Sequence, residues 1–351
     1  MLRAETSARP VLESLERVCG THKLEGLGAR LGRLAELVRW DMASVETELG
    51  RVDRQERTVH QAAHHLLATE GKRLRPICVA LASRLGTGFS DEAKALGVAV
   101  EVVHCATLLH DDVVDQGDVR RGIPAARTIY GNAVSIFGGD HLLIDALRRV
   151  RQAQVPGALE RLLDIIDEMI YAESLQLESR GQVETTEERY FEIVEGKTAA
   201  LFRWAMFAGA RAGGLDMKQS RELETYGKHL GVAFQLVDDL LDYTGDESKT
   251  GKGLFADLRE GKMTHPLLLA RDRDPRVREI LALGLDADSV VTPAARSILS
   301  EALEATGALA ATRDLAREHA SKAVDSLASF EASEARSALL TVAEACVSRE
   351  R

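Results

Sequence analysis

Two acidic clusters with the same spacing are the residues of this sequence best suited to chemistry. They lie in the segments EVVHCATLLHDDVVDQGDVRRG and VAFQLVDDLLDYTGD, and their members are Asp111, Asp112 and Asp115, and Asp238, Asp239 and Asp242. The first and last carboxylates of each cluster are four residues apart, so on a helix they share one face. Each cluster follows an apolar stretch, where uncompensated carboxylates are costly unless a cation joins them.

The donor chemistry of these clusters favours a hard metal ion. Oxygen ligands without His or Cys select Mg²⁺, for which Mn²⁺ is a substitute. Mg²⁺ keeps several waters and typically shares its shell with phosphate oxygens of a substrate. A single acidic cluster would more often be a solvated helix end, but two copies in apolar helices favour a metal. We therefore predict a Mg²⁺ site that acts on a phosphorylated substrate.

Basic residues flank both acidic clusters. Each would ordinarily be a surface charge, but Arg forks and Lys point charges are the usual diphosphate ligands. The candidates are Lys72, Arg73 and Arg75 in GKRLRP, Arg120 and Arg121 after the first cluster, Lys197 in EGKTAALF, and Lys252 and Lys262 in the segment 245–263. The Gly-x4-Gly-Lys-Ser/Thr pattern is absent, so none of these belongs to a Walker A loop.

Helices must position these side chains, because apolar residues recur three and four apart along most of the chain and no alternating window persists as a strand. We expect helices at about 26–50, 52–69, 75–86, 91–115, 132–152, 156–180, 187–213, 216–244, 264–284, 293–306 and 308–349. No break is long enough to be a domain linker. The sequence therefore predicts an all-α protein with an N-terminal extension at 1–25 and a single domain at 26–351.

Composition excludes some classes of function. The chain of 351 residues has 45 Lys plus Arg against 55 Asp plus Glu, a net charge of −10, which argues against a nucleic-acid partner. No stretch of uninterrupted apolar residues approaches the length of about eighteen that spans a membrane, and charged residues stand where a signal peptide needs an apolar core, so we expect a cytoplasmic protein. The cysteines form no CxxC pair and are predicted to be reduced structural thiols; they are Cys19, Cys78, Cys105 and Cys346.

Six stretches together resemble one known family, the trans-type polyprenyl diphosphate synthases. In chain order they are GKRLRP, HCATLLHDDVVDQGDVRRG, YGNAVSIFGGDHLL, EGKTAALF, FQLVDDLLDYTGD and TGKGLFADLREGKMTHPLL. The resemblance implies an isoprenoid synthase fold with helices around a deep central cavity, usually as a homodimer. It also implies Mg²⁺-dependent head-to-tail condensation of isopentenyl diphosphate onto an allylic diphosphate, with peripheral membrane contact for product release.

The resemblance assigns roles to individual residues. The six aspartates would bind Mg²⁺ and, with Lys197, form the catalytic set. The allylic diphosphate would be held by Arg120, Lys197, Thr198, Gln235, Lys252 and Lys262. Isopentenyl diphosphate would be held without metal by Lys72, Arg75, His104 and Arg121, although a lone His in an apolar helix is more often a core residue. Two positions depart from the family pattern: Glu70 replaces the first Gly of GGKRxRP, and His265 replaces an apolar residue before Pro266.

Two small residues bear on product length. Ala106 lies five residues before Asp111, about 7.5 Å away along a helix, and is followed by Thr107. Family members that stop at farnesyl or geranylgeranyl length typically carry an aromatic there, and HxATLLHDD resembles the long-chain, octaprenyl-like enzymes that make quinone side chains. Alternatively, Ala106 is small only to let two helices pack. On the long-chain interpretation, a bulkier residue deeper in the cavity would stop the growing chain; the candidates are Ile166, Met169 and Ile170.

Three alternatives remain at this point. The first is a geranylgeranyl or farnesyl diphosphate synthase with the same chemistry. The second is a class I terpene cyclase, although the second cluster here is another DDxxD and aromatics make up only 4% of the chain. The third is a noncatalytic synthase subunit, which would be expected to lack some of the six aspartates.

Overall fold

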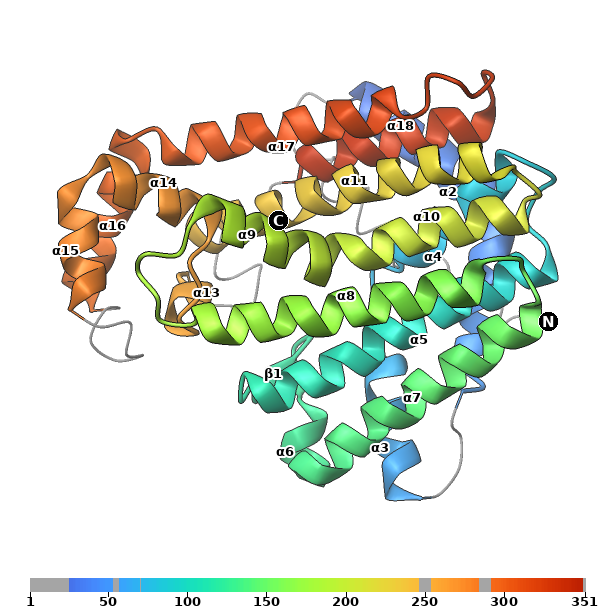
Figure 1. Cartoon of the computed structure of the whole chain (residues 1–351), viewed down its shortest axis with the longest axis horizontal. Helices are drawn as coiled ribbons and strands as arrows, with labels where there is room; N and C mark the ends of the chain where they lie inside the picture. The colour runs from blue at the N-terminus through green and yellow to red at the C-terminus, as the bar shows by residue number, and fades with distance from the viewer. Residues whose placement is uncertain (1–24, 53–56, 70, 246–253, 284–291, 350–351) are drawn as a thin grey trace. The chain divides into compact units, whose positions relative to one another are not determined.

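The computed structural model describes residues 25–52, 57–69, 71–245, 254–283 and 292–349 (Figure 1). Helices dominate this part of the chain, which confirms the predicted all-α class. The chain forms two compact units, each assembled from three separate stretches of sequence. Unit 1 contains residues 1–163, 201–225 and 326–342, and unit 2 contains residues 164–200, 226–325 and 343–351. The predicted extension at 1–25 lies almost entirely outside the described residues.

Unit 1 is built around one apolar helix, α5. Its elements are α2 (Glu25–Leu49), α3 (Thr58–Leu67), α4 (Leu74–Arg84), α5 (Asp91–Val114), β1 (Val119–Arg120), β2 (Ile123–Pro124), α6 (Ala126–Tyr130), α7 (Asn132–Ala153) and most of α10 (Ala200–Ala212). Helix α5 begins at Ser90, whose hydroxyl accepts from the Ala93 backbone N–H, and it packs against α2, α3, α4 and α7. Among the described helices, α5 alone is long and apolar enough to cross a membrane, and 67% of that stretch is buried inside the protein.

The predicted absence of strands is wrong at one place. Strands β1 and β2 pair antiparallel across a tight turn formed by Arg121 and Gly122. Both residues have positive φ angles, 53° and 77°, which a two-residue hairpin turn of this kind requires. The strands have only two residues each, too few for an alternating pattern to appear in the sequence.

Unit 2 contains the other helices, apart from the first parts of α8, α11 and α18, which belong to unit 1. Its elements are most of α8 (Ala158–Ser179), α9 (Glu187–Val194), the π-helix η1 (Glu195–Ala199), most of α11 (Met217–Thr244), α13 (Ala256–Arg259), α14 (His265–Arg273), α15 (Pro275–Ala282), α16 (Pro293–Ala305), α17 (Ala308–Asp325) and the end of α18 (Glu334–Val347).

Three predicted helices are interrupted in the structure. The helix expected at 187–213 contains the π-helix, and the helix expected at 308–349 breaks before Ser333, whose hydroxyl caps α18 by accepting from the Arg336 N–H. The helix expected at 264–284 breaks at Asp274 because Pro275 starts a new helix and Asp274 caps it.

The structure describes three of the four cysteines, and their reduced state stays a prediction. Cys78, Cys105 and Cys346 are buried. Burial, with the nearby charge of Glu101, raises the pKa of Cys105 to about 12, which makes its thiol unreactive. Cys19 lies outside the described residues.

A pair of histidines joins α11 and α17 in unit 2. The Nδ1 atoms of His229 and His319 are 3.2 Å apart, and the His319 ring stacks on Phe191. Burial and the neighbouring charges of His229 and Lys322 lower the pKa of His319 to about 4. Both rings are therefore neutral in the folded protein near pH 7.

This pair should make stability depend on pH. Between about 6.5, where an unperturbed histidine titrates, and about 4, the unfolded chain binds more protons than the folded protein, so the free energy of unfolding falls as the pH is lowered. We expect a lower melting temperature at about pH 5 than at about pH 7, and a smaller drop in His319→Gln. Circular dichroism melts of both proteins test this, and equal drops would contradict it.

Candidate active site

The first aspartate cluster lies at the C-terminal end of α5 in unit 1. Asp111 and Asp112 stand in its last turn and Asp115 is the C-cap, with its N–H bonded to the Asp111 carbonyl at 2.8 Å. The helix ends because Gln116 adopts a left-handed conformation with φ of 54°. A helix C-terminus is the negative end of the helix dipole, and α5 has no basic residue in its last turn. These carboxylates therefore favour a cation.

The members of this cluster are not equivalent. Asp112 is 1% exposed and accepts hydrogen bonds from Arg120, Nε at 2.8 Å and Nη2 at 2.6 Å. Burial raises the pKa of Asp112, and the guanidinium of Arg120 partly offsets this. Asp111 and Asp115 are partly exposed. Asp112 thus orients Arg120, whereas the outer two carboxylates are accessible to a ligand.

Several cations of unit 1 converge on His104. Burial lowers the pKa of His104 well below its usual range, and neighbouring guanidiniums lower it further. The guanidiniums responsible belong to Arg75, Arg121, Arg73 and Arg120. His104 is therefore a neutral imidazole surrounded by positive charge, as expected of a residue that helps to bind an anion.

Individual contacts fix two of these guanidiniums. The Arg75 guanidinium lies 4.6 Å from the centroid of the Phe202 ring. Arg121 donates from Nη1 to the Thr69 hydroxyl at 3.0 Å. Lys72 is exposed. The four residues predicted to hold isopentenyl diphosphate therefore belong to unit 1, and Arg75, His104 and Arg121 form one cationic site.

The second aspartate cluster ends α11 in unit 2, again without a basic residue in the last turn. Asp239 is 1% exposed and accepts from the Tyr190 hydroxyl at 2.6 Å, the Gln235 amide at 2.8 Å and the His265 backbone N–H at 3.2 Å. Burial, with the charge of Asp257, raises the pKa of Asp239 to about 7 despite these bonds. Three hydrogen bonds therefore hold the Asp239 carboxylate in one position.

The outer carboxylates of the second cluster also have protein partners. Asp238 accepts from Arg349 Nη2 at 2.9 Å, and the Arg349 guanidinium lies 4.0 Å from the centroid of the Phe234 ring. Asp242 caps the short helix α13 by accepting from the backbone N–H groups of Ala256 and Asp257, at 2.9 and 3.3 Å.

The donor set of both clusters fits a hard cation that brings further ligands with it. Within the described residues, no three His, Cys, Asp or Glu side chains converge closely enough to hold a metal ion alone. All the accessible donors are carboxylate oxygens, which suit Mg²⁺. Such an ion would complete its shell with water and substrate oxygens, as Mg²⁺ typically does.

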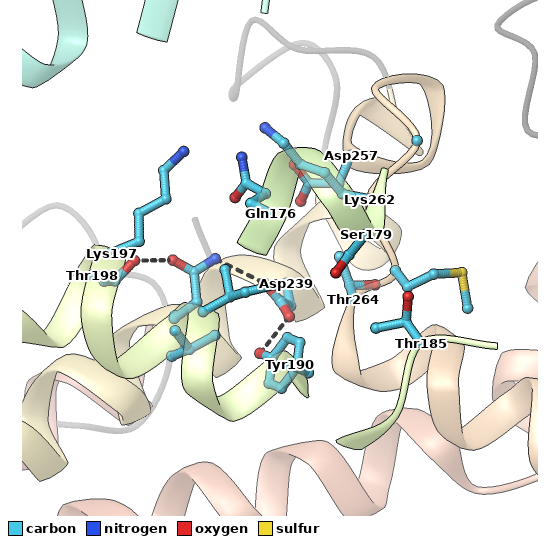
Figure 2. A pocket seen from close by; sticks show the side chains of 15 residues that line it. Gln176, Ser179, Thr185, Tyr190, Lys197, Thr198, Asp239, Asp257, Lys262 and Thr264 are labelled. Atoms are coloured by element: carbon cyan, nitrogen blue, oxygen red, sulfur yellow. Dashed lines mark hydrogen bonds between the residues drawn. The ribbon is translucent and has the colours of Figure 1, made fainter. Parts of the chain in front are cut away.

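Unit 2 contains a pocket of about 200 Å³ beside Asp239 (Figure 2). Its lining residues are Gln176, Ser179, Thr185, Tyr190, Ile193, Val194, Lys197, Thr198, Gln235, Asp239, Asp257, Gly261, Lys262, Met263 and Thr264. The pocket thus collects Lys197, Thr198, Gln235 and Lys262, which the sequence predicted as allylic diphosphate ligands. In Figure 2 the side chains of Lys197 and Lys262 start from opposite flanks of the pocket and extend toward the same side.

A hydrogen-bond chain fixes the floor of this pocket. The Thr198 hydroxyl donates to Gln235 Oε1 at 2.7 Å, the Gln235 amide donates to Asp239, and Tyr190 donates to the other oxygen of Asp239 (Figure 2). Lys197 forms an ion pair with Glu173 at 2.6 Å. These bonds hold the polar side chains of the pocket in place, so a diphosphate that entered it would exchange partners with side chains that are already ordered.

Lys197 and Thr198, which line the pocket, lie in the π-helix. Residues 195–199 follow α9 directly and precede α10, so one wider turn is inserted between two regular helices. Gly196 is required in this turn because a Cβ there would lie 2.6 Å from Ala172 Cβ and 3.0 Å from the Glu168 carbonyl oxygen. Single π turns inside α-helices occur frequently at functional sites.

Comparison with known proteins identifies the family. The Polyprenyl synthetase family model matches residues 56–298. The chain belongs to the polyprenyl synthetase family. The octaprenyl diphosphate synthase of Escherichia coli K12 is 34% identical over 92% of this chain and 99% of its own length. A short chain isoprenyl diphosphate synthase of Methanothermobacter thermautotrophicus is also 34% identical, over 84% of this chain and 91% of its own.

A solved structure supports the same assignment. The polyprenyl synthase of Caulobacter crescentus CB15, complexed with calcium and isoprenyl diphosphate, is 40% identical, covers 91% of this chain and 98% of its own, and superimposes with a TM-score of 0.86. This polyprenyl synthetase is therefore a prenyltransferase with the isoprenoid synthase fold.

The predicted ligands of this polyprenyl synthetase divide between the two units. Unit 1 holds Asp111, Asp112 and Asp115 with the cations around His104, and unit 2 holds the second cluster with the pocket. Arg120, predicted as an allylic ligand, is in unit 1 and bound to Asp112. Asp238 and Asp242 do not line the pocket. Lys252 lies outside the described residues.

The residues predicted to set product length differ in how exposed they are, and their role stays a prediction. Ala106 is 1% exposed, and the Thr107 hydroxyl donates to the His104 carbonyl at 2.9 Å. Among the candidates for a deeper stop, Ile166 and Met169 are partly buried. Ile170 is 65% exposed, which argues against it.

Sequence reasoning missed four residues of the site: Tyr190, Glu173, Asp257 and Arg349. Tyr190 and Arg349 contact the second cluster from distant parts of the chain. Glu173 meets Lys197 only because α8 packs against the π-helix. Tyr190, Glu173 and Arg349 belong to no motif and to no helical spacing shared with their partners, so no local signal could have found them. Asp257 lies within the stretch TGKGLFADLREGKMTHPLL, but its place beside the pocket depends on the fold.

Proposed function

We propose that this enzyme is a Mg²⁺-dependent trans-polyprenyl diphosphate synthase that condenses isopentenyl diphosphate onto an allylic diphosphate and makes a long-chain product, for quinone side chains. The observation that carries the proposal is the pairing, in each unit, of a helix-terminal aspartate cluster with positioned cations. The Caulobacter relative with calcium and isoprenyl diphosphate supports this combination of cation and substrate.

The allylic partner would react through loss of its diphosphate. The allylic carbon–oxygen bond breaks, the carbon becomes a delocalised cation, and the bonding electrons stay on the diphosphate. Lys197, Lys262, Thr198 and Gln235 would hold that diphosphate as its charge grows, and Arg120 would contribute from beside Asp112. Bound Mg²⁺ on the aspartate clusters would supply further charge stabilisation at the same oxygens.

The second substrate would provide the electrons for the new bond. Lys72, Arg75, His104 and Arg121 would bind the diphosphate of isopentenyl diphosphate, so that its double bond attacks the allylic cation and forms a carbon–carbon bond. A proton is then lost, and the departing diphosphate is the base we propose. The remaining contribution of the protein is orientation and exclusion of water, which would otherwise convert the cation to an alcohol.

Product length is the finer part of the proposal. Ala106 and Thr107 have small side chains that would leave room for a growing chain below the first cluster, and the E. coli relative is an octaprenyl diphosphate synthase. A short-chain synthase is the second candidate, because a relative of that kind has the same identity to this chain. The deciding assay incubates the protein with labelled isopentenyl diphosphate, farnesyl diphosphate and Mg²⁺, removes phosphate and sizes the products by chromatography. Absence of any condensation would refute the synthase.

The two diphosphate sites should separate kinetically. Lys72→Ala and Arg75→Ala each remove a ligand of isopentenyl diphosphate, so we expect KM for that substrate to rise by about tenfold with little change for the allylic partner. Lys197→Ala should act chiefly on the allylic diphosphate. Initial rates with each substrate varied in turn test both expectations. The opposite pattern would show that the two sites are exchanged.

The assembly and location are part of the same proposal. We propose a homodimer, supported by exposed apolar side chains on one stretch of α7, among them Phe137 at 58% and Ile144 at 47% exposed. Light scattering would then give about twice the chain mass of 38.3 kDa. The cytoplasmic location and a peripheral membrane contact during product release stay predictions.

A further inference from the structure

The middle cation of the GKRLRP segment differs from its neighbours. Lys72 is exposed and Arg75 is partly exposed, whereas the Arg73 side chain is only 5% exposed. Arg73 donates from Nε to Glu46 on α2 and from Nη1 to Glu101 on α5, each at 2.7 Å. Two carboxylates therefore balance its charge, which leaves little of that charge to attract a ligand.

Arg73 has an unfavourable backbone conformation, which its side-chain hydrogen bonds help to hold. Arg73 is the N-cap residue of α4, with φ of 45° and ψ of 30°, a left-handed conformation that residues with a Cβ avoid. Such a conformation persists only where its surroundings hold it. Its side chain supplies that hold by joining α2 and α5, and the conformation sets how the chain passes from Lys72 into the helix that carries Arg75.

Arg73 also holds the segment that positions Arg121. Its Nη2 donates to the carbonyls of Leu67 and Thr69 at 3.2 and 3.4 Å, and the Thr69 hydroxyl receives the bond from Arg121. A Cβ on Gly71 would lie 3.0 Å from Arg73 Nη1 and 2.9 Å from Arg121 Nη1, so both guanidiniums rest on this glycine.

Glu101 connects Arg73 to His104, the remaining residue of the predicted isopentenyl diphosphate site. This carboxylate is 2% exposed and lies one helical turn before His104 on α5. The bond from Arg73 therefore ties the start of α4 to the stretch of α5 that presents His104.

We propose that Arg73 is a positioning residue that assembles the isopentenyl diphosphate site without touching the substrate. The backbone of Arg73 places Lys72 and Arg75. Its contacts with Thr69 and Gly71 place Arg121, and its bond to Glu101 fixes the position of these cations relative to His104. The inference rests on the proposed function, because the substrate it names is the one proposed for these four residues.

Steady-state kinetics test the inference with Arg73→Met and Arg73→Lys. We expect Arg73→Met to raise KM for isopentenyl diphosphate by about tenfold while KM for the allylic diphosphate changes less than about twofold. Arg73→Lys, which keeps one charge but cannot reach both carboxylates with a planar fork, should lie between. The double variant Arg73→Met/Glu101→Gln avoids a buried unpaired carboxylate and should show the same KM pattern if the single variant does not fold.

The chain offers a matched control at the other end of α4. Arg84 also pairs with α2, donating to Asp41 at 2.6 and 2.9 Å, but it lies away from the cationic site. Arg84→Met should lower the melting temperature and leave both KM values unchanged. Equal changes in both KM values for Arg73→Met, or no change beyond that of Arg84→Met, would overturn the positioning role. Absence of condensation by the unmodified enzyme would instead refute the proposed function on which it rests.

Discussion

Replacing Asp111 or Asp238 with Ala should lower kcat by about 10³-fold or more while leaving the helical content intact. Each is the first carboxylate of its cluster, each is partly exposed, and each stands near the C-terminal end of an apolar helix. Loss of either would remove a ligand to the cation that balances the departing diphosphate. Product formation and circular dichroism on the same samples measure both expectations.

A surface carboxylate provides the control for this prediction. Asp314 on α17 is 72% exposed and pairs with Arg317, one turn later on the same helix. Asp314→Ala should retain the activity of the unmodified enzyme, because exposed pairs of this kind contribute little. If Asp111→Ala or Asp238→Ala retained activity within about tenfold of the parent, the metal role of that cluster would be wrong.

Replacing Ala106 with Tyr should shorten the product to geranylgeranyl length or less without abolishing condensation. A growing chain extends away from its diphosphate, so a ring five residues before Asp111 on α5 would block it while the diphosphate ligands stay in place. Because Ala106 is 1% exposed, the same ring could instead crowd packed helices, at a cost of about 1–3 kcal/mol. Chromatography of dephosphorylated products, together with a thermal melt, separates the two effects.

The small substitution Ala106→Ser is the matched control. It adds one hydroxyl, leaves the space below the first cluster open, and should retain the long product. A fall in melting temperature with an unchanged product distribution in Ala106→Tyr would show that Ala106 is small for helix packing only. A native product no longer than geranylgeranyl diphosphate would also end the long-chain hypothesis.

The parts of the fold that sequence predicted are those specified locally. Apolar residues three and four apart marked α5 and α11, and the spacing of Asp111 and Asp115 alone places both on one helix face. The breaks within helices were missed where one or two residues decide them. Asp274 before Pro275 and the π turn at Gly196 change too few positions to disturb an apolar pattern.

The sequence could not predict that the middle aspartate of each cluster is buried while the outer two are partly exposed. Six aspartates with identical spacing suggested six equivalent ligands, yet Asp112 is bound by Arg120 and Asp239 by Tyr190. These contacts depend on which face of each helix is buried and on what packs against it. That information is carried by tertiary structure and not by the motif.

In this family member the π-helix positions pocket residues at the expense of a regular α-helical backbone. A chain shorter by one residue within 195–199 could run as an ordinary α-helix, with regular hydrogen bonds and no need for glycine at position 196. That change would rotate Lys197 and Thr198 about the helix axis relative to the helix before them, away from their contacts with Glu173 and Gln235. A deletion here would thus trade catalysis for a more regular backbone, so thermostability alone is a poor guide when variants of this segment are selected.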